Sequence, residues 1–124
     1  MRKGLSLNDS DRKPWLNLLA LKIKEWNAKG DAVLACSALK KDYRIILSQD
    51  NEVTFIFLDG DYDLIYSRLS KRKKHFFSKK MLEKQFTILE RPIDCIKIPI
   101  NQSVENICFM ISSNLKNKIN EKKE

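Results

Sequence analysis

The sequence predicts an α/β fold in which helices flank a parallel sheet. Three short runs of β-branched, aromatic and aliphatic residues have the length of strands, and segments with helical periodicity separate them. Strands that alternate with helices are typical of a doubly wound parallel sheet. The expected strands are Ala32–Cys36, Val53–Leu58 and Ile96–Ile100. Because the chain has 124 residues, no internal repeat and no long linker, we expect one domain, residues 1–124.

The first helix is expected over residues 14–29, after an irregular polar segment. Pro14 suits a first helical turn, apolar residues recur at helical spacing from Leu16 to Trp26, and Lys29-Gly30 form a C-terminal stop. The other expected helices are residues 39–48, the segment around Leu64–Leu69 capped by Asp61 or Asp63, Met81–Leu89 before Pro92, and a last helix capped by Ser103 and followed by a frayed tail at residues 116–124.

Polar side chains follow the first expected strand directly. Ala32–Cys36 is continuously apolar, which suggests a strand covered on both faces. Ser37 ends this run, and Lys40 and Arg44 come next, on the following helix or just before it. Ligands of open α/β sheets bind beyond the carboxyl ends of the strands. We therefore expect Ser37, Lys40 and Arg44 to face a small anionic ligand.

Charge and composition limit the class of protein. The 24 Lys and Arg outnumber the 16 Asp and Glu, so the net charge is +8, which favours anionic partners such as phosphates, acidic metabolites or nucleic acid. No apolar run approaches the roughly 20 residues of a membrane span, and the first residues lack the apolar core of a signal peptide. The three cysteines are widely spaced in apolar surroundings, which suits reduced thiols in the cytoplasm and predicts no metal site.

A basic segment follows the third expected helix. Arg68 and Arg72 are four residues apart and should project from one helix face. Residues 71–80 then interleave cations with His75 and two phenylalanines. This composition fits a solvated loop, a nucleic-acid-binding surface or a mobile lid whose arginines close over phosphates.

Two longer motifs resemble the gluconokinase family of small-molecule kinases. D-x-D-R-x-P-W-L begins at Asp9, and A-C-S-A-L-K-x-x-Y-R begins at Ala35. The likeness spans about residues 1–108, with Ser6 where that family usually has proline. Further residues in the order and spacing of the family are Arg68-Leu69, Arg72, His75-Phe76-Phe77, Gln85-Phe86 and Leu89-Glu90.

The resemblance implies a P-loop kinase fold and the reaction ATP + D-gluconate → ADP + 6-phospho-D-gluconate, with ATP and Mg²⁺ as cofactors. Enzymes of this kind are often homodimers. This sequence has glycine only at positions 4, 30 and 60, so it contains no G-x-x-x-x-G-K-[ST] phosphate loop. The implied fold is therefore an incomplete doubly wound sheet that lacks its first two strands, roughly 50 residues. No cofactor-binding residue can be identified, and the lid is expected at about residues 71–80.

The resemblance also implies roles for individual residues. Arg68 and Arg72 would be catalytic and would neutralise charge that develops on the transferred phosphoryl group. The acceptor would contact Arg12, Ser37, Lys40 and Arg44, with His75 and Gln85 as further substrate-binding residues. Asp59-Gly60-Asp61 has the letters of the family's acidic acceptor segment, but it follows the strand that leads to the lid helix and so stands in the wrong place.

Three interpretations remain at this point. The chain is a truncated gluconokinase, inactive alone without the phosphate loop, or a non-catalytic remnant or subunit of such a kinase, or a basic nucleic-acid-binding module. In this kinase class the missing strand lies between those matching Ala32–Cys36 and Val53–Leu58. Their facing edges would therefore collapse together, pair with another chain or stay frayed, and we expect low stability.

Overall fold

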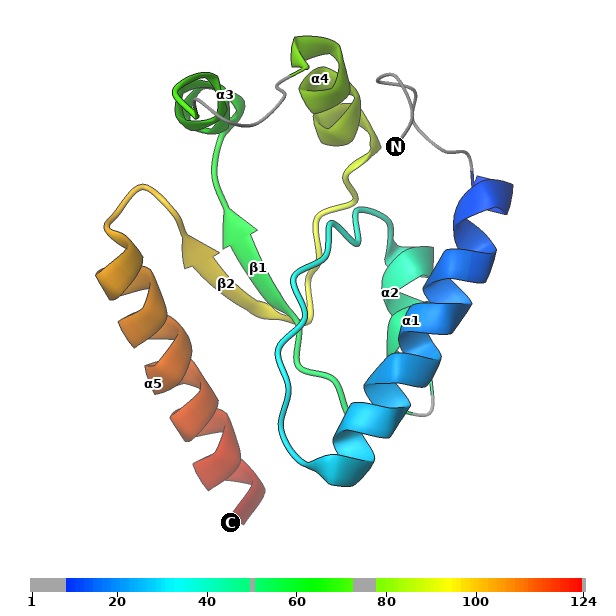
Figure 1. The fold of residues 1–124 in the computed structure, drawn as a ribbon. Helices are drawn as coiled ribbons and strands as arrows, with labels where there is room; N and C mark the ends of the chain where they lie inside the picture. The colour runs from blue at the N-terminus through cyan, green and yellow to red at the C-terminus, as the bar shows by residue number, and fades with distance from the viewer. Residues whose placement is uncertain (1–8, 50, 73–77, 124) are drawn as a thin grey trace. The chain divides into compact units, whose positions relative to one another are not determined.

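The computed structural model describes residues 9–49, 51–72 and 78–123 (Figure 1). It divides into two compact units, Met1–Val53 with Ser78–Arg91, and Thr54–Phe77 with Pro92–Glu124. The elements in chain order are α1 (Asp9–Lys29), α2 (Lys41–Ser48), β1 (Ile56–Asp59), α3 (Tyr62–Ser70), α4 (Lys79–Ile88), β2 (Ile96–Pro99) and α5 (Val104–Lys123).

The first unit contains α1, α2 and α4. Helix α1 packs against α2, and the two lie side by side in Figure 1. The buried apolar side chains of this pair are Leu16 and Ile23 from α1 and Tyr43 and Leu47 from α2. The side-chain amide of Asn51 donates to the Ala20 carbonyl oxygen at 3.1 Å, which ties the end of α2 to the middle of α1.

Helix α1 is longer than the sequence predicts. It begins at Asp9, so residues 9–13 are helical and Pro14 lies past the first turn. A proline there removes one backbone donor and disfavours the turn before it. The sequence of this first turn is acidic, and acidic residues near a helix N-terminus generally favour helix formation through the helix dipole. The expected irregular segment is therefore wrong for residues 9–13.

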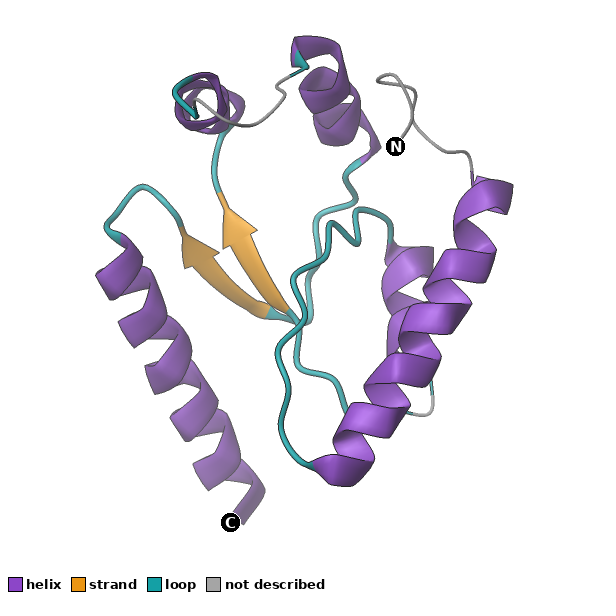
Figure 2. Cartoon of the chain, in the orientation of Figure 1, coloured by secondary structure: helices purple, strands orange, loops and turns teal. Residues whose placement is uncertain are grey.

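The expected strand Ala32–Cys36 is absent. The chain between α1 and α2 is a loop (Figure 2), and the Val33 side chain is 97% exposed. A buried strand needs a neighbour to pair with and elements to cover it. Among the described residues no strand pairs with this segment. An apolar run is thus necessary for a buried strand but does not form one alone.

The second unit contains the sheet. Strands β1 and β2 are parallel, with Ile56 opposite Ile96 and Asp59 opposite Pro99, and they lie side by side in Figure 2. The Ile98 side chain is fully buried, and α5 packs against β2. Parallel pairing is confirmed, but within the described residues the sheet has two strands and not the expected three. Strand β1 also begins later than predicted.

The turn after β1 explains Asp59-Gly60-Asp61 in structural terms. A Cβ atom on Gly60 would lie 2.6 Å from Cδ1 and 2.7 Å from Cγ1 of Ile100. Asp61 is the N-cap of α3, and its Oδ1 accepts from the Leu64 backbone N–H at 2.8 Å. In this turn, Gly60 allows a close approach to Ile100 and Asp61 caps α3. Of the two expected caps, Asp61 and Asp63, the first is confirmed.

The last helix confirms one expectation and corrects another. Ser103 Oγ accepts from the Asn106 backbone N–H at 3.2 Å, which is the predicted cap. The expected frayed tail is wrong, because α5 continues to Lys123. The residues after Leu115 contain neither glycine nor proline and are rich in lysine and glutamate, which are good helix formers.

Candidate functional site

Tyr43 is the centre of the candidate site, and two of the predicted cations flank its ring. The tyrosine lies on α2 and is 6% exposed. The Arg12 Cζ atom lies 5.6 Å from the ring centroid, and the Lys40 Nζ atom lies 5.7 Å from it. Both distances are within the range of cation–π interactions. Packing of α1 on α2 therefore brings together Arg12 from one helix and Lys40 from the N-cap of the other.

The two cations are suited to binding an anion. Both side chains are half-buried, so their charges are less screened by solvent than those of exposed lysines. Guanidinium and ammonium groups donate charge-assisted hydrogen bonds to carboxylates and phosphates. The small anionic ligand that the sequence analysis expects here stays a prediction.

Arg44 joins this cluster, but its guanidinium is directed at the backbone. Its Nη1 atom donates to the carbonyl oxygens of Ala38 at 2.7 Å and Leu39 at 3.2 Å. Its Nη2 atom donates to the Glu90 carbonyl oxygen at 2.7 Å. Three of the five donors of a guanidinium are thus used on main-chain oxygens.

The turn that Arg44 holds has an unusual conformation. Ala38 has a φ of +39°, in the left-handed region that residues with a Cβ atom rarely adopt. Ser37, the predicted hydrogen-bonding residue, precedes this turn and is exposed. Such a conformation persists where neighbouring contacts determine it, and it occurs often at binding sites.

Sequence reasoning assigned no role to Glu90. Its backbone N–H donates to the Leu39 carbonyl oxygen at 2.8 Å, and its Oε1 atom accepts from the Lys41 backbone N–H at 2.9 Å. One signal could have pointed to it, because lysine is a poor N-cap and α2 would need an acceptor from elsewhere. That acceptor lies 49 residues away along the chain, so local patterns do not reveal it.

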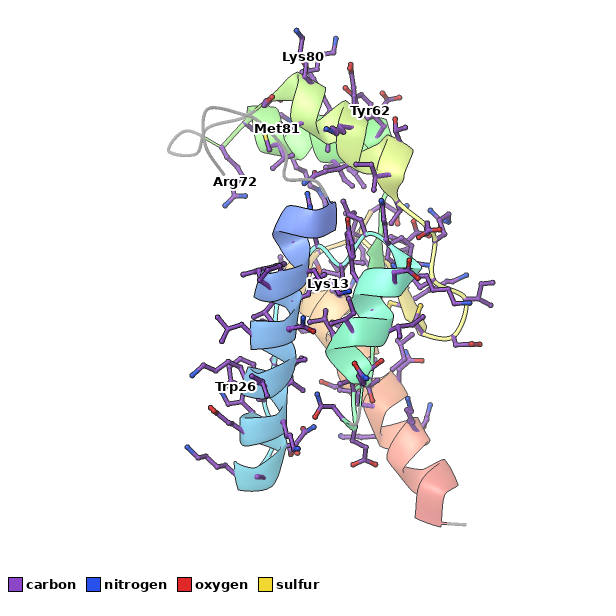
Figure 3. The ribbon with its side chains drawn as sticks, turned by 90° about the vertical axis from the view of Figure 1, so that its right-hand side faces the viewer. Lys13, Trp26, Tyr62, Arg72, Lys80 and Met81 are labelled. Atoms are coloured by element: carbon purple, nitrogen blue, oxygen red, sulfur yellow. The ribbon has the colours of Figure 1, made fainter. Side chains whose placement is uncertain are left out.

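The remaining predicted residues are placed differently. Gln85 is half-buried on α4, in the same unit as Arg12 and Lys40. Arg68 and Arg72 are exposed and belong to the other unit. The expectation that both lie on one helix face is wrong for Arg72, because α3 ends at Ser70 and the Arg72 side chain extends from the chain beyond it (Figure 3). His75 lies outside the described residues, as does the middle of the expected lid.

The residues present do not fit a nucleotide anchor. The sequence has no G-x-x-x-x-G-K-[ST] motif, and Gly60 is used in the close approach to Ile100. In residues 9–49, 51–72 and 78–123, no group of three or more His, Cys, Asp or Glu side chains could hold a metal ion. None of its described helices has both the length and the apolar character needed to cross a membrane.

Solved structures identify the class of this fold. A sugar kinase from Janibacter sp. HTCC2649 matches 94% of this chain and 70% of its own, with a TM-score of 0.81 and 34% identity. A gluconokinase from Sinorhizobium meliloti 1021 matches 94% of this chain and 71% of its own, with a TM-score of 0.73 and 26% identity. The two units thus have the α/β fold of a sugar kinase, with a small parallel sheet.

Curated relatives identify the family. The chain is 43% identical to the thermoresistant gluconokinase of Escherichia coli K12 over 86% of this chain and 65% of that protein. It is 36% identical to a probable gluconokinase of Mus musculus over 94% of this chain and 75% of that protein. A scan of protein-family models found no match. The chain belongs to the gluconokinase family, and it spans only 60% and 65% of the length of the two E. coli gluconokinases that it matches.

Proposed function

We propose that this chain carries the acceptor-binding half of a gluconokinase and that Arg12 and Lys40 bind the carboxylate of D-gluconate. The observation that supports this most directly is the position of both cations at the ring of one buried tyrosine, 5.6 and 5.7 Å from its centroid. Gluconate is a carboxylate that bears hydroxyls, so its site requires cations together with neutral hydrogen-bonding groups. Membership of the gluconokinase family supports the choice of this sugar acid.

The other predicted residues have roles within this proposal. Ser37 and Gln85 bind hydroxyls of the sugar acid, and His75 is a further substrate contact. In a kinase that also contains the phosphate loop, Arg68 and Arg72 act on the transferred phosphoryl group in the reaction ATP + D-gluconate → ADP + 6-phospho-D-gluconate, which uses Mg²⁺. The 124 residues contain no phosphate loop to anchor ATP. They therefore bind the acceptor without phosphorylating it.

The proposal also includes the cellular location of the protein, its oligomeric state and the role of its basic segment. Cys36, Cys95 and Cys108 are free thiols, which suits the reducing environment of the cytoplasm. The family likeness favours a homodimer, and sedimentation of the purified chain tests this directly. The basic segment 71–80 serves the kinase lid in this proposal and does not bind nucleic acid.

Titration calorimetry of the 124-residue protein with sodium gluconate tests the proposal. Sorbitol is the matched ligand, because it is an open-chain polyol without a carboxylate. Gluconate should bind in the absence of nucleotide and sorbitol should not. Arg12→Gln and Lys40→Gln should each lower the affinity about tenfold or more, as expected for loss of a charge-assisted contact.

The control variant is Lys24→Gln, which removes an exposed cation from the same helix as Arg12. It should leave the gluconate affinity unchanged. Equal binding of gluconate and sorbitol, or equal losses in Lys24→Gln and Arg12→Gln, would overturn the proposed site. A coupled assay with ATP and gluconate should show no turnover, and measurable turnover would contradict the restriction to acceptor binding.

A further inference from the structure

Helix α2 begins without a cap from its own N-cap residue. Lys40 has extended backbone angles, φ −102° and ψ 149°, and its side chain makes no capping hydrogen bond. The first backbone N–H groups of a helix have no partner within the helix and require an acceptor. Glu90 Oε1 accepts from the Lys41 N–H at 2.9 Å. The carboxylate thus replaces the missing cap, and its charge also suits a helix N-terminus.

The residue before Lys40 is held by the same glutamate. The Leu39 carbonyl oxygen accepts from the Glu90 backbone N–H at 2.8 Å. Lys40 therefore lies between two backbone groups, one on each side, that are both bonded to Glu90. This fixes the direction in which the lysine side chain leaves the main chain, and its Nζ atom lies 5.7 Å from the Tyr43 ring centroid.

Arg44 bonds both to the turn before Lys40 and to Glu90. Its Nη1 atom donates to the Ala38 and Leu39 carbonyl oxygens at 2.7 and 3.2 Å, and its Nη2 atom donates to the Glu90 carbonyl oxygen at 2.7 Å. The guanidinium therefore joins the turn before α2 to the residues after α4. The same bonds hold Ala38 at its positive φ of +39°.

We infer that Arg44 and Glu90 are positioning residues that set Lys40 for the carboxylate of gluconate and do not contact the acceptor themselves. The inference rests on the proposed function. It gives Arg44 a different task from Arg12 and Lys40, although all three are cations of one cluster. Its physical basis is geometry rather than charge, because planar guanidinium donors reach three carbonyl oxygens that a lysine could not bond together.

Conservative substitutions separate positioning from direct binding. Arg44→Lys keeps the positive charge but loses the fork of donors, so gluconate affinity should fall about three- to tenfold. A cation that bound the carboxylate only through its charge would tolerate this change. Glu90→Gln keeps a side-chain oxygen acceptor for the Lys41 N–H and should bind gluconate nearly as the wild type does. Glu90→Ala removes that acceptor and should lose affinity as Arg44→Lys does.

A double-variant cycle supplies the second readout. In a Lys40→Gln background the lysine to be positioned is gone, so Arg44→Lys should cause no further loss of gluconate affinity. Amide hydrogen exchange of the Lys41 N–H should be faster in Glu90→Ala than in Glu90→Gln. Circular dichroism checks that each variant is folded. If Glu90→Ala does not fold, the comparison of Glu90→Gln with Arg44→Lys tests the inference instead.

The outcomes distinguish the two proposals. If the wild type binds gluconate and Arg44→Lys binds it equally well, or loses the same affinity with and without Lys40, the positioning role is wrong and the proposed site stands. If the wild type does not bind gluconate, the proposed function fails and the inference fails with it. Loss in Arg44→Lys that disappears in the Lys40→Gln background supports positioning.

Discussion

Strand β1 and the segment Ala32–Cys36 make an instructive pair. Both are short apolar runs that precede a helix, and both are expected strands. β1 pairs in parallel with β2, whereas residues 32–36 form a loop in which Val33 is 97% exposed. Residues 53–58 contain more β-branched and aromatic side chains than residues 32–36. The two runs also differ in what surrounds them, and a strand becomes stable only when a neighbour bonds its backbone and side chains cover its faces.

The largest loss of unfolding free energy should come from a substitution at a buried residue of the sheet. Ile98 on β2 is 0% exposed, so Ile98→Ala should destabilise the protein by about 2–5 kcal/mol through lost burial and the cavity left behind. Ile93 belongs to the same unit and is 85% exposed, which makes Ile93→Ala the matched control. Urea unfolding measures the free energy of both. Similar losses in the two variants would show that β2 does not form the core of its unit.

The turn after β1 tests how closely this unit is packed. Gly60→Ala would place a Cβ atom 2.6 Å from Ile100 Cδ1, and such overpacking should cost about 1–3 kcal/mol of unfolding free energy. Because the cost comes from contact with one side chain, the double variant with Ile100→Ala should recover part of it, and a double-mutant cycle measures the recovery.

Gly30 provides the contrast. A Cβ atom there meets nothing within 4 Å, but the φ of +147° is strained for any residue with a side chain. Gly30→Ala should therefore be destabilising to the same extent with and without Ile100→Ala. Equal behaviour of the two glycine variants in this cycle would contradict a packing role for Gly60.

The cap of α3 should have a smaller effect. Asp61 Oδ1 accepts from the Leu64 N–H at 2.8 Å, so Asp61→Ala should lower the unfolding free energy by about 0.5–2 kcal/mol. Asp63 lies in the first turn of the same helix but is not its N-cap residue. Asp63→Ala should therefore lower the unfolding free energy by less. Urea unfolding of the pair gives the comparison. A larger loss in Asp63→Ala would mean that the helix dipole and not the cap dominates.

Features that depend on near neighbours in the sequence are the ones that could be predicted. Asp61 and Ser103 cap the helices that they were expected to cap, because a cap bonds an N–H group only three residues away. Arg12 and Lys40 both lie beside the Tyr43 ring, and the expectation that they share a site came from the family resemblance. The role of Glu90 could not be predicted from local patterns, because its carboxylate accepts from the Lys41 N–H across 49 residues. The loop conformation of residues 32–36 could not be predicted either, since a strand forms only where a partner strand pairs with it.

The smallest change in unfolding free energy should come from a substitution in the exposed loop at residues 32–36. Val33→Ala should change the unfolding free energy by less than about 0.5 kcal/mol, because the side chain is almost fully exposed and buries nothing. Leu47 in the same unit is 2% exposed, and Leu47→Ala should cost about 2–5 kcal/mol.

Trp15 and Trp26 both lie on α1 in this unit, so tryptophan fluorescence follows its unfolding for both variants. Amide exchange gives an independent measure of the same contrast. The N–H groups of residues 32–36 should exchange quickly, whereas those of Ile96 and Ile100, which donate to Phe55 and Asp59 carbonyl oxygens at 3.1 and 2.9 Å, should be protected. Protection of residues 32–36, or a loss in Val33→Ala comparable to that in Leu47→Ala, would mean that this run is covered in solution. In that case the apolar composition would again indicate a buried strand, and the contrast with β1 would disappear.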